Sequence, residues 1–275
     1  MAYRKVDEAS LTAVANSIRA KGGTTGALAF PDGFVSAVQA IQAGGGEADS
    51  SFKDIIERTA VNPTLPSDLT KIGNYAFYGY KNIALTSLPD ALTSIGNSAF
   101  YNCTNLALTS LPDGVTSIGN SAFQGCNKIK ITLLPDGVTS IGSSAFYDCQ
   151  KLALTSLPDG VTIIKYATFQ NDINLALTSL PDGVTSIEDY AFYSCRRLAL
   201  TSLPSSLTSI GNYALGYCTI LSTLTFKGTP SSIANTAFSG CTNLKTINVP
   251  WAEGAVANAP WGANKATINY NYTGA

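Results

Sequence analysis

The sequence predicts a repeat solenoid, a parallel β-solenoid built from about eight coils of 23 residues each. Two columns of side chains carry this prediction. The cysteines stand 23 residues apart, or twice that distance, at Cys103, Cys126, Cys149, Cys195, Cys218 and Cys241. A phenylalanine column has the same spacing, with Leu215 in its one gap, at Phe77, Phe100, Phe123, Phe146, Phe169, Phe192 and Phe238. Because such a short unit cannot bury its apolar face alone, we expect each coil to stack on the next and extend one core.

Eight coils cover residues 65–248 without an insertion or deletion at the core positions. An isoleucine column from Ile72 to Ile233 and the leucine of a Leu-Pro pair from Leu65 to Leu203 repeat with the same period. Four of the eight coils contain Pro-Asp-Gly, which predicts a turn because proline presets φ and glycine accepts positive φ. The VTSI and LALTS segments alternate in the manner of short strands. Stacked coils would pair these strands in parallel, about 4.8 Å apart.

The pattern LPxxVTSIGxxAFxxCxxL resembles the BspA-like leucine-rich repeats of bacterial surface proteins, over about two thirds of the chain. The resemblance implies a curved solenoid with a role in attachment to proteins or host surfaces. The fifth repeat departs from the pattern, since Lys165 replaces glycine, Thr168 replaces alanine and Asp172 replaces cysteine. We therefore expect that coil to be locally weaker.

The residues outside the repeats predict three further parts. Residues 1–46 show two apolar helical stripes and predict a helical attachment segment that docks on the solenoid, pairs with another copy or inserts into a larger assembly. Part of it, SLTAVANSIRAKGGTTGALAFPDGFVSAVQAI, is similar to an N-terminal module of phage and prophage structural proteins of Gram-positive hosts. Residues 47–64 predict a linker and an N-terminal cap.

Residues 249–275 break the period and predict a C-terminal cap, because the last coil of a solenoid exposes an apolar edge. This segment contains both tryptophans of the chain, Trp251 and Trp261. We expect their indoles to shield the last coil. Binding of a partner by exposed indoles is the alternative.

Composition argues against several classes of function. Charged residues make up 13% of the chain and the net charge is −1, so the basic excess typical of nucleic-acid binding is missing. No apolar run of about 18 residues predicts a membrane span. There is no histidine, phosphate-binding loop or GxSxG motif, which disfavours an enzyme. We expect no cofactor.

The cysteine column has a plain interpretation as reduced, buried, small apolar side chains. Tyr80 stands at the same position in the first coil, which suggests that the position lies near the surface. Stacking would also bring cysteines of neighbouring coils close enough for their thiols to oxidise to a disulfide. The best candidate metal site is Cys149 with Asp172 and Cys195, although a single file of ligands suits zinc poorly.

An acidic column consists of Asp90, Asp113, Asp136, Asp159 and Asp182. Stacking would place these carboxylates roughly 5 Å apart, where a divalent cation such as calcium would relieve their repulsion. The simpler interpretation is that aspartate suits the turn and stays solvated. A threonine column, Thr86 to Thr201, is similarly interpreted as a solvated β face.

Tyrosines form the candidate partner-binding surface. Those directly after the phenylalanine column are Tyr78, Tyr101, Tyr147 and Tyr193, and those two residues before it include Tyr190 and Tyr213. Tyrosine offers flat apolar contact and a hydroxyl, which suits protein or sugar partners. The alternative is that these rings pack on one another and shield the edges of the coils.

The sequence therefore favours a non-enzymatic binding or adhesion scaffold that recognises a protein or glycan on a cell surface. The similarity of residues 1–46 to a phage module suggests that this scaffold is part of a phage or prophage particle. A structural spacer without a ligand and, far behind it, an enzyme are the alternatives. The N-terminus has charges where a signal peptide would need an apolar core. We thus expect no signal peptide and leave open a virion or cell-surface destination.

Overall fold

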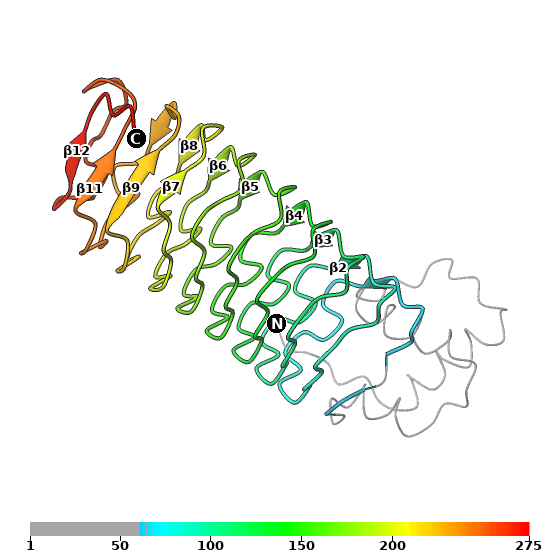
Figure 1. The fold of residues 1–275 in the computed structure, drawn as a ribbon. Helices are drawn as coiled ribbons and strands as arrows, with labels where there is room; N and C mark the ends of the chain where they lie inside the picture. Colours follow the sequence, from blue (N-terminus) through cyan, green and yellow to red (C-terminus); the bar gives the residue numbers. More distant parts are fainter. Residues whose placement is uncertain (1–60, 64, 275) are drawn as a thin grey trace, which may run out of the picture. The chain divides into compact units, whose positions relative to one another are not determined.

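The computed structural model describes residues 61–63 and 65–274, which all belong to one compact unit of the chain, Asp32–Ala275. The described residues form successive coils stacked side by side (Figure 1). The predicted fold class, a parallel β-solenoid with a spacing of 23 residues, is confirmed. The helices expected in residues 1–46 and most of the linker and cap expected in residues 47–64 lie outside the described residues.

Within residues 61–63 and 65–274, twelve short strands form three parallel sheets of four strands each. The first sheet contains β1 (Lys71–Ile72), β2 (Ser94–Ile95), β3 (Ser117–Ile118) and β4 (Ser140–Ile141). The second contains β5 (Ile163–Ile164), β6 (Ser186–Ile187), β8 (Ser209–Ile210) and β10 (Ser232–Ile233). The third contains β7 (Ser202–Leu203), β9 (Thr223–Phe226), β11 (Thr246–Asn248) and β12 (Thr267–Asn269). The first two sheets come from the VTSI segments, as predicted.

The LALTS segments behave differently from the prediction, because they form regular strands only from β7 onward. In earlier coils they are joined by isolated bonds, such as the one that Ala107 N–H donates to the Leu85 carbonyl oxygen at 3.0 Å. The TLTF of β9 and the TIN of β11 are rich in threonine and in branched or aromatic residues, which favour strands. Composition does not explain β7, because Ser202–Leu203 lies in a LALTSLP segment like those of the earlier coils and forms a strand where it pairs with β9.

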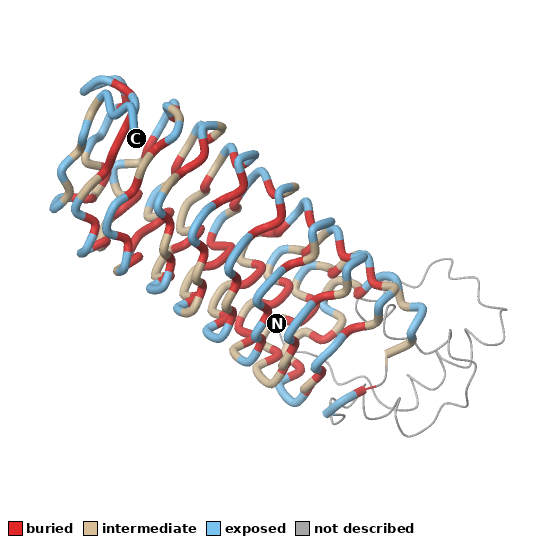
Figure 2. Tube along the Cα trace, viewed as in Figure 1, coloured by how far each residue is buried: buried red, intermediate tan, exposed pale blue. Residues whose placement is uncertain are grey.

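The core is a set of side-chain columns that run along the stack. The phenylalanine rings lie face to face, with centroids 5.1 Å apart for Phe77 and Phe100 and 5.7 Å apart for Phe146 and Phe169. Buried residues recur at the same places in each coil (Figure 2). The predicted stacking of identical residues is confirmed. Burial of these rings and of the aliphatic columns around them drives folding.

The loop that carries each phenylalanine up to Phe192 owes its shape to two residues in the left-handed conformation, whereas the loop of Phe238 has only Gly240 in that conformation. In the second coil these are Ser98 (φ 51°) and Asn102 (φ 54°), two residues before and two after Phe100. The turns aim alternate backbone N–H groups at the next coil, so that Phe100 N donates to Ala122 O at 2.7 Å. The coils are therefore hydrogen-bonded through this loop as well as through the strands.

The C-terminal segment adds a shortened turn beyond the eighth coil. Its strand β12 pairs with β11 in the register Thr246↔Thr267, a spacing of 21 residues rather than 23. Trp251 and Trp261 are both buried, and their rings pack on Phe226 with centroid separations of 5.1 and 6.3 Å. The predicted shielding by the indoles is confirmed, and the alternative of exposed, partner-binding indoles is wrong.

A glycine column follows the isoleucine column, because there the backbone of one coil touches the preceding coil. A Cβ added at Gly119 would lie 2.5 Å from the backbone nitrogen of Asn97. In the same contact, Asn97 Oδ1 accepts a hydrogen bond from Asn120 N–H at 2.8 Å. At Gly119 a side chain is thus excluded by space rather than by φ, although Glu188 and Ala234 stand at the equivalent positions of the sixth and eighth coils.

The fifth coil, residues 157–179, breaks this pattern. Lys165 takes the glycine position, and β4 does not pair with β5, so that the sheets end there. On the other side of the same coil the stack continues, since Ser144 N donates to Tyr166 O at 2.8 Å. The interruption is therefore confined to one face.

The cysteine column is fully interior, contrary to the suggestion that it lies near the surface. Tyr80, the residue that prompted that suggestion, is itself 2% exposed. Each thiol donates to the carbonyl oxygen of the residue 26 positions earlier, as Cys126 Sγ does to Phe100 O at 2.9 Å. Burial raises the pKa of Cys126 well above its usual value and that of Cys241 to about 11. The cysteines are free thiols, held protonated in the core.

Asp172 occupies the cysteine position of the fifth coil and is completely buried. Its Oδ1 accepts a hydrogen bond from Cys149 N–H at 2.6 Å, and its Oδ2 has no partner. Burial raises the pKa of Asp172 well above its usual range, the Cys149 N–H lowers it in part, and the charge of Asp148 raises it again. The side chain is therefore an acid that the core stabilises only in its neutral form.

Replacing Gly119 by alanine should destabilise the protein, because its Cβ would meet the backbone of Asn97. We expect a loss of about 1 to 3 kcal/mol, as for other overpacked sites, measured by denaturant unfolding. Gly137→Ala is the matched control, since its Cβ would come no closer than 3.8 Å to any neighbour. Equal stability of the two variants would refute the steric argument.

Asp172→Cys should stabilise the protein, because it restores the interior column and removes the unpartnered Oδ2. Relief of a buried unsatisfied polar atom is worth about 1 to 3 kcal/mol, which would raise the melting temperature by a few degrees. A scanning calorimetry experiment compares this variant with Ser194→Cys, a cysteine added nearby at a half-buried position. A lower melting temperature for Asp172→Cys would contradict the prediction.

The stability of the protein should fall as pH rises above about 4, the unfolded-state pKa of aspartate. The folded state holds the Asp172 proton more tightly than the unfolded state does. The contribution of this proton to the free energy of unfolding is therefore fully present below the unfolded-state pKa and is lost as pH rises through the raised folded-state pKa. Asp172→Asn, which keeps an oxygen acceptor for Cys149 N–H, should flatten this decline. Denaturant midpoints between pH 4 and pH 8 measure it, and identical slopes for the two proteins would show that Asp172 is not responsible.

Candidate binding surfaces

The six predicted tyrosines are all half-buried, but they do not form one continuous row. Tyr78 and Tyr101 stack with centroids 4.7 Å apart and planes at 4°. Tyr147 is in ring contact with none of the other aromatic residues in the described ranges, because Gln124 and Gln170 hold the equivalent positions on either side. The remaining three tyrosines lie in a second group.

The second group is larger than predicted. Tyr190, Tyr193 and Tyr213 contact one another, with centroids 5.5 to 6.1 Å apart. Tyr166 packs edge-on against Tyr190 at 6.1 Å, and Tyr217 packs against Tyr193 at 5.2 Å. We call these five residues the tyrosine cluster. It spans the fifth to seventh coils.

Tyr166 and Tyr217 were missed because neither belongs to a tyrosine column. Tyr166 stands where other coils have asparagine, serine or aspartate, and Tyr217 where they have glycine, asparagine, aspartate or serine. They are also the most exposed members of the cluster, at 50% and 47%. The crowding has an electrostatic effect on Tyr193, whose pKa is raised by burial and by neighbouring Tyr217, Tyr190 and Tyr213.

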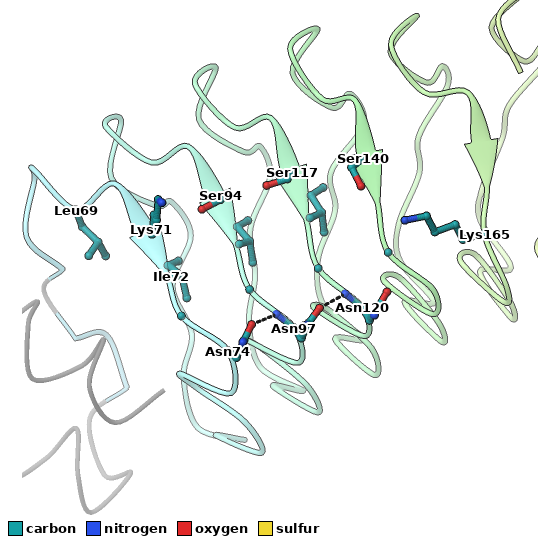
Figure 3. Close-up of a pocket in the computed structure, with 16 residues that line it drawn as sticks. Leu69, Lys71, Ile72, Asn74, Ser94, Asn97, Ser117, Asn120, Ser140 and Lys165 are labelled. Carbon is teal, nitrogen blue, oxygen red and sulfur yellow. Dashed lines mark hydrogen bonds between the residues drawn. The ribbon is translucent and has the colours of Figure 1, made fainter. Parts of the chain in front are cut away.

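A groove of about 630 Å³ runs across β1 to β4, on the face made by the VTSI segments (Figure 3). Lys71 stands at one end and Lys165 at the other, with serines and asparagines of successive coils between them. Sequence reasoning did not single out this surface. The sequence feature that could have predicted this groove is the glycine column, because glycines at successive coils leave a strip of backbone without side chains.

A second, smaller groove of about 400 Å³ crosses β6, β8 and β10 on the same face. Its lining includes Glu188 and Asp189, together with Tyr166 of the tyrosine cluster. The fifth coil, in which Lys165 replaces glycine, thus separates two grooves of different charge.

The geometry argues against a metal site at Cys149, Asp172 and Cys195. The thiols donate to main-chain carbonyl oxygens, and Asp172 accepts from a main-chain N–H. Burial raises the pKa of both thiols well above the usual value, which disfavours the thiolate that a metal needs. Among residues 61–63 and 65–274, no three His, Cys, Asp or Glu side chains are grouped so that they could hold a metal ion.

The acidic column is exposed at each of its five positions. Asp182 pairs with Lys227, with 3.8 Å between Oδ1 and Nζ, and both side chains are largely exposed. Such a pair contributes little to stability. The threonine column is likewise exposed, although most of it lies outside regular strands.

Within the described part of the chain no helix is both long and apolar enough to span a membrane. No curated protein matches the sequence. Among solved structures, a leucine-rich repeat protein from Bacteroides ovatus is similar, with 26% identity and a TM-score of 0.56 over 78% of this chain. The match covers 61% of the Bacteroides ovatus chain, so this chain corresponds to only part of that protein.

A leucine-rich repeat protein from Treponema pallidum is 28% identical over 67% of this chain and 78% of its own, with a TM-score of 0.49. A leucine-rich cell surface protein from Faecalibacterium prausnitzii is 24% identical over 75% of this chain and 84% of its own, with a TM-score of 0.31. The likeness to the Bacteroides ovatus protein indicates a leucine-rich repeat scaffold. The family described as "BspA type Leucine rich repeat region (6 copies)" matches residues 49–176 and 164–254. The chain therefore belongs to the BspA-type leucine-rich-repeat family.

Proposed function

We propose that this protein is a non-enzymatic scaffold that binds a protein on a cell surface through the tyrosine cluster. Leucine-rich-repeat proteins typically bind proteins. Residues 1–46, which lie outside the described residues, would tether the scaffold, as their similarity to a phage and prophage module suggests. Carriage on a phage particle belongs to the same proposal.

The observation that carries the proposal is the contact among five half-exposed rings of three successive coils. The rings already restrain one another, with Tyr190 stacked on Tyr213 at 5.5 Å and Tyr193 edge-on to Tyr217 at 5.2 Å. Binding would then cost little side-chain entropy, because few rotamers remain to be lost. Tyrosine is also enriched among the residues that dominate interface energetics.

A spacer without a ligand would not need this arrangement. The coils stack through the phenylalanine column and the main-chain hydrogen bonds, and these continue through coils without the extra tyrosines. Tyr166 and Tyr217 add exposed aromatic area at positions where the other coils have small or polar residues. Their presence favours a recognition role over a purely mechanical one.

The triple variant Tyr190→Ala/Tyr193→Ala/Tyr213→Ala should lose cell binding by about tenfold or more, since hot-spot residues contribute at least about 2 kcal/mol. The measurement is flow cytometry of the labelled full-length chain on bacterial and host cells, with and without protease treatment of the cells. Thr109→Ala/Thr132→Ala/Thr155→Ala, on the exposed threonine column, is the control and should bind as the parent does.

The result is interpretable only if the triple variant keeps its cooperative melting transition. Undiminished binding by that variant would exclude the tyrosine cluster as the contact. Binding that survives protease but is lost after glycosidase would identify a glycan partner instead. Absence of binding to every cell type tested would favour the spacer.

A further inference from the structure

The groove across β1 to β4 has a floor of bare backbone. Gly96, Gly119 and Gly142 form this floor, and a Cβ at any of them would come within 2.6 Å of the preceding coil. The strip therefore cannot be filled by side chains without forcing the coils apart. An extended chain laid along it would meet main-chain atoms and the short side chains on either side.

The walls of the groove are rich in hydrogen-bond donors. The Oδ1 atoms of Asn97 and Asn120 each accept from the main-chain N–H one coil further on, at 2.8 and 2.9 Å. Their Nδ2 groups have no acceptor among the described residues and are exposed to solvent. Ser94 and Ser117 add hydroxyls on the other wall (Figure 3).

The two ends of the groove are positive. Lys165 extends from the fifth coil toward β4, and Lys71 lies on β1 (Figure 3). Neither lysine forms an ion pair with another described residue, and no aspartate or glutamate lines this groove. The neighbouring groove has the opposite character, with Glu188 and Asp189 and no lysine or arginine in its lining.

We propose that the groove across β1 to β4 binds an extended, acidic segment of a protein partner. Lys71 and Lys165 are four coils apart, which is about 19 Å at the spacing of parallel strands, the length of about six residues in an extended chain. Carboxylates near the two ends of such a segment would reach the lysines. Its main-chain carbonyl groups would accept from the asparagine amides and serine hydroxyls. This inference rests on the proposed binding role.

A peptide fits better than an anionic polysaccharide for two reasons. The groove presents a row of hydrogen-bond donors, and an extended peptide offers a main-chain carbonyl acceptor at each residue, so that about six carbonyl groups span the four coil spacings. The groove also contains no aromatic side chain on which a sugar ring would stack. The family's general preference for protein partners agrees with this choice.

The test uses the full-length protein and a fluorescein-labelled hexaglutamate peptide, followed by fluorescence anisotropy at low salt. We expect hexaglutamate to bind about tenfold more tightly than labelled hexaglutamine, and the affinity to fall as salt is added. Lys71→Gln/Lys165→Gln should weaken hexaglutamate binding by about tenfold, the effect of two partly exposed ion pairs. Ser117→Glu, which places a carboxylate in the groove, should weaken it without removing either lysine.

The control is Lys128→Gln/Lys151→Gln, which removes the same charge from two exposed lysines outside the groove. It should change the affinity by less than about twofold. An equal loss in both double variants, or no preference for hexaglutamate over hexaglutamine, would overturn the inference. Tighter binding of polygalacturonate with the same dependence on Lys71 and Lys165 would also overturn it, in favour of an anionic glycan.

The two proposals fail separately. The tyrosine triple variant should bind hexaglutamate as the parent does, because none of its three residues lines this groove. If cell binding depends on the tyrosines but the groove does not bind hexaglutamate, the groove inference is wrong and the proposed function still holds.

Discussion

The spacing between coils is the constraint on which the rest of the structure depends. Main-chain hydrogen bonds join each coil to the next along the strands and along the phenylalanine loop, and they hold equivalent residues one strand spacing apart. Every side chain in an interior column must therefore pack against a copy of itself. Phenylalanine meets this condition by stacking, with ring planes of Phe100 and Phe123 only 4° apart. A repeated charge could not meet it, because neighbouring charges would repel without solvent to screen them.

The exceptions to the columns show how much the constraint tolerates. Leu215 interrupts the phenylalanine stack and remains buried, because an apolar side chain of similar size needs no partner. Asp172 is a single acid among thiols, held by one main-chain N–H. Lys165 stands at the glycine position where strand pairing stops on that face, whereas Glu188 stands at the same position of the sixth coil and β5 and β6 remain paired. The fifth coil is thus a junction between two sheets and two grooves.

The period of the sequence predicts which residues share an environment, but not which environment they share. Phe100 and its equivalents could be assigned to the core because they are large and apolar. The environment of the cysteine position was harder to predict, because Tyr80 at that position suggested the surface. In the structure the side chains at this position, Tyr80 included, are buried in the core. The strand content of the LALTS segments depends on the neighbouring coil, since Ser202–Leu203 of one such segment forms β7 where it pairs with β9. The groove depends on contacts between Gly119 and Asn97, which lie on adjacent coils rather than in one repeat.

The tyrosine cluster and the grooves were predictable only in part, for a related reason. Tyr190, Tyr193 and Tyr213 stand in recurring positions and were found from the sequence. Tyr166 and Tyr217 occur once each in their columns, so nothing in the repeat marks them. A strictly periodic surface cannot fix where a partner binds, because a shift by one coil presents the same side chains again. Unrepeated residues such as Lys165, Tyr166 and Tyr217 remove that degeneracy. Both proposals therefore place specific recognition at such unrepeated residues, in the fifth to seventh coils and at the end of the groove where Lys165 lies.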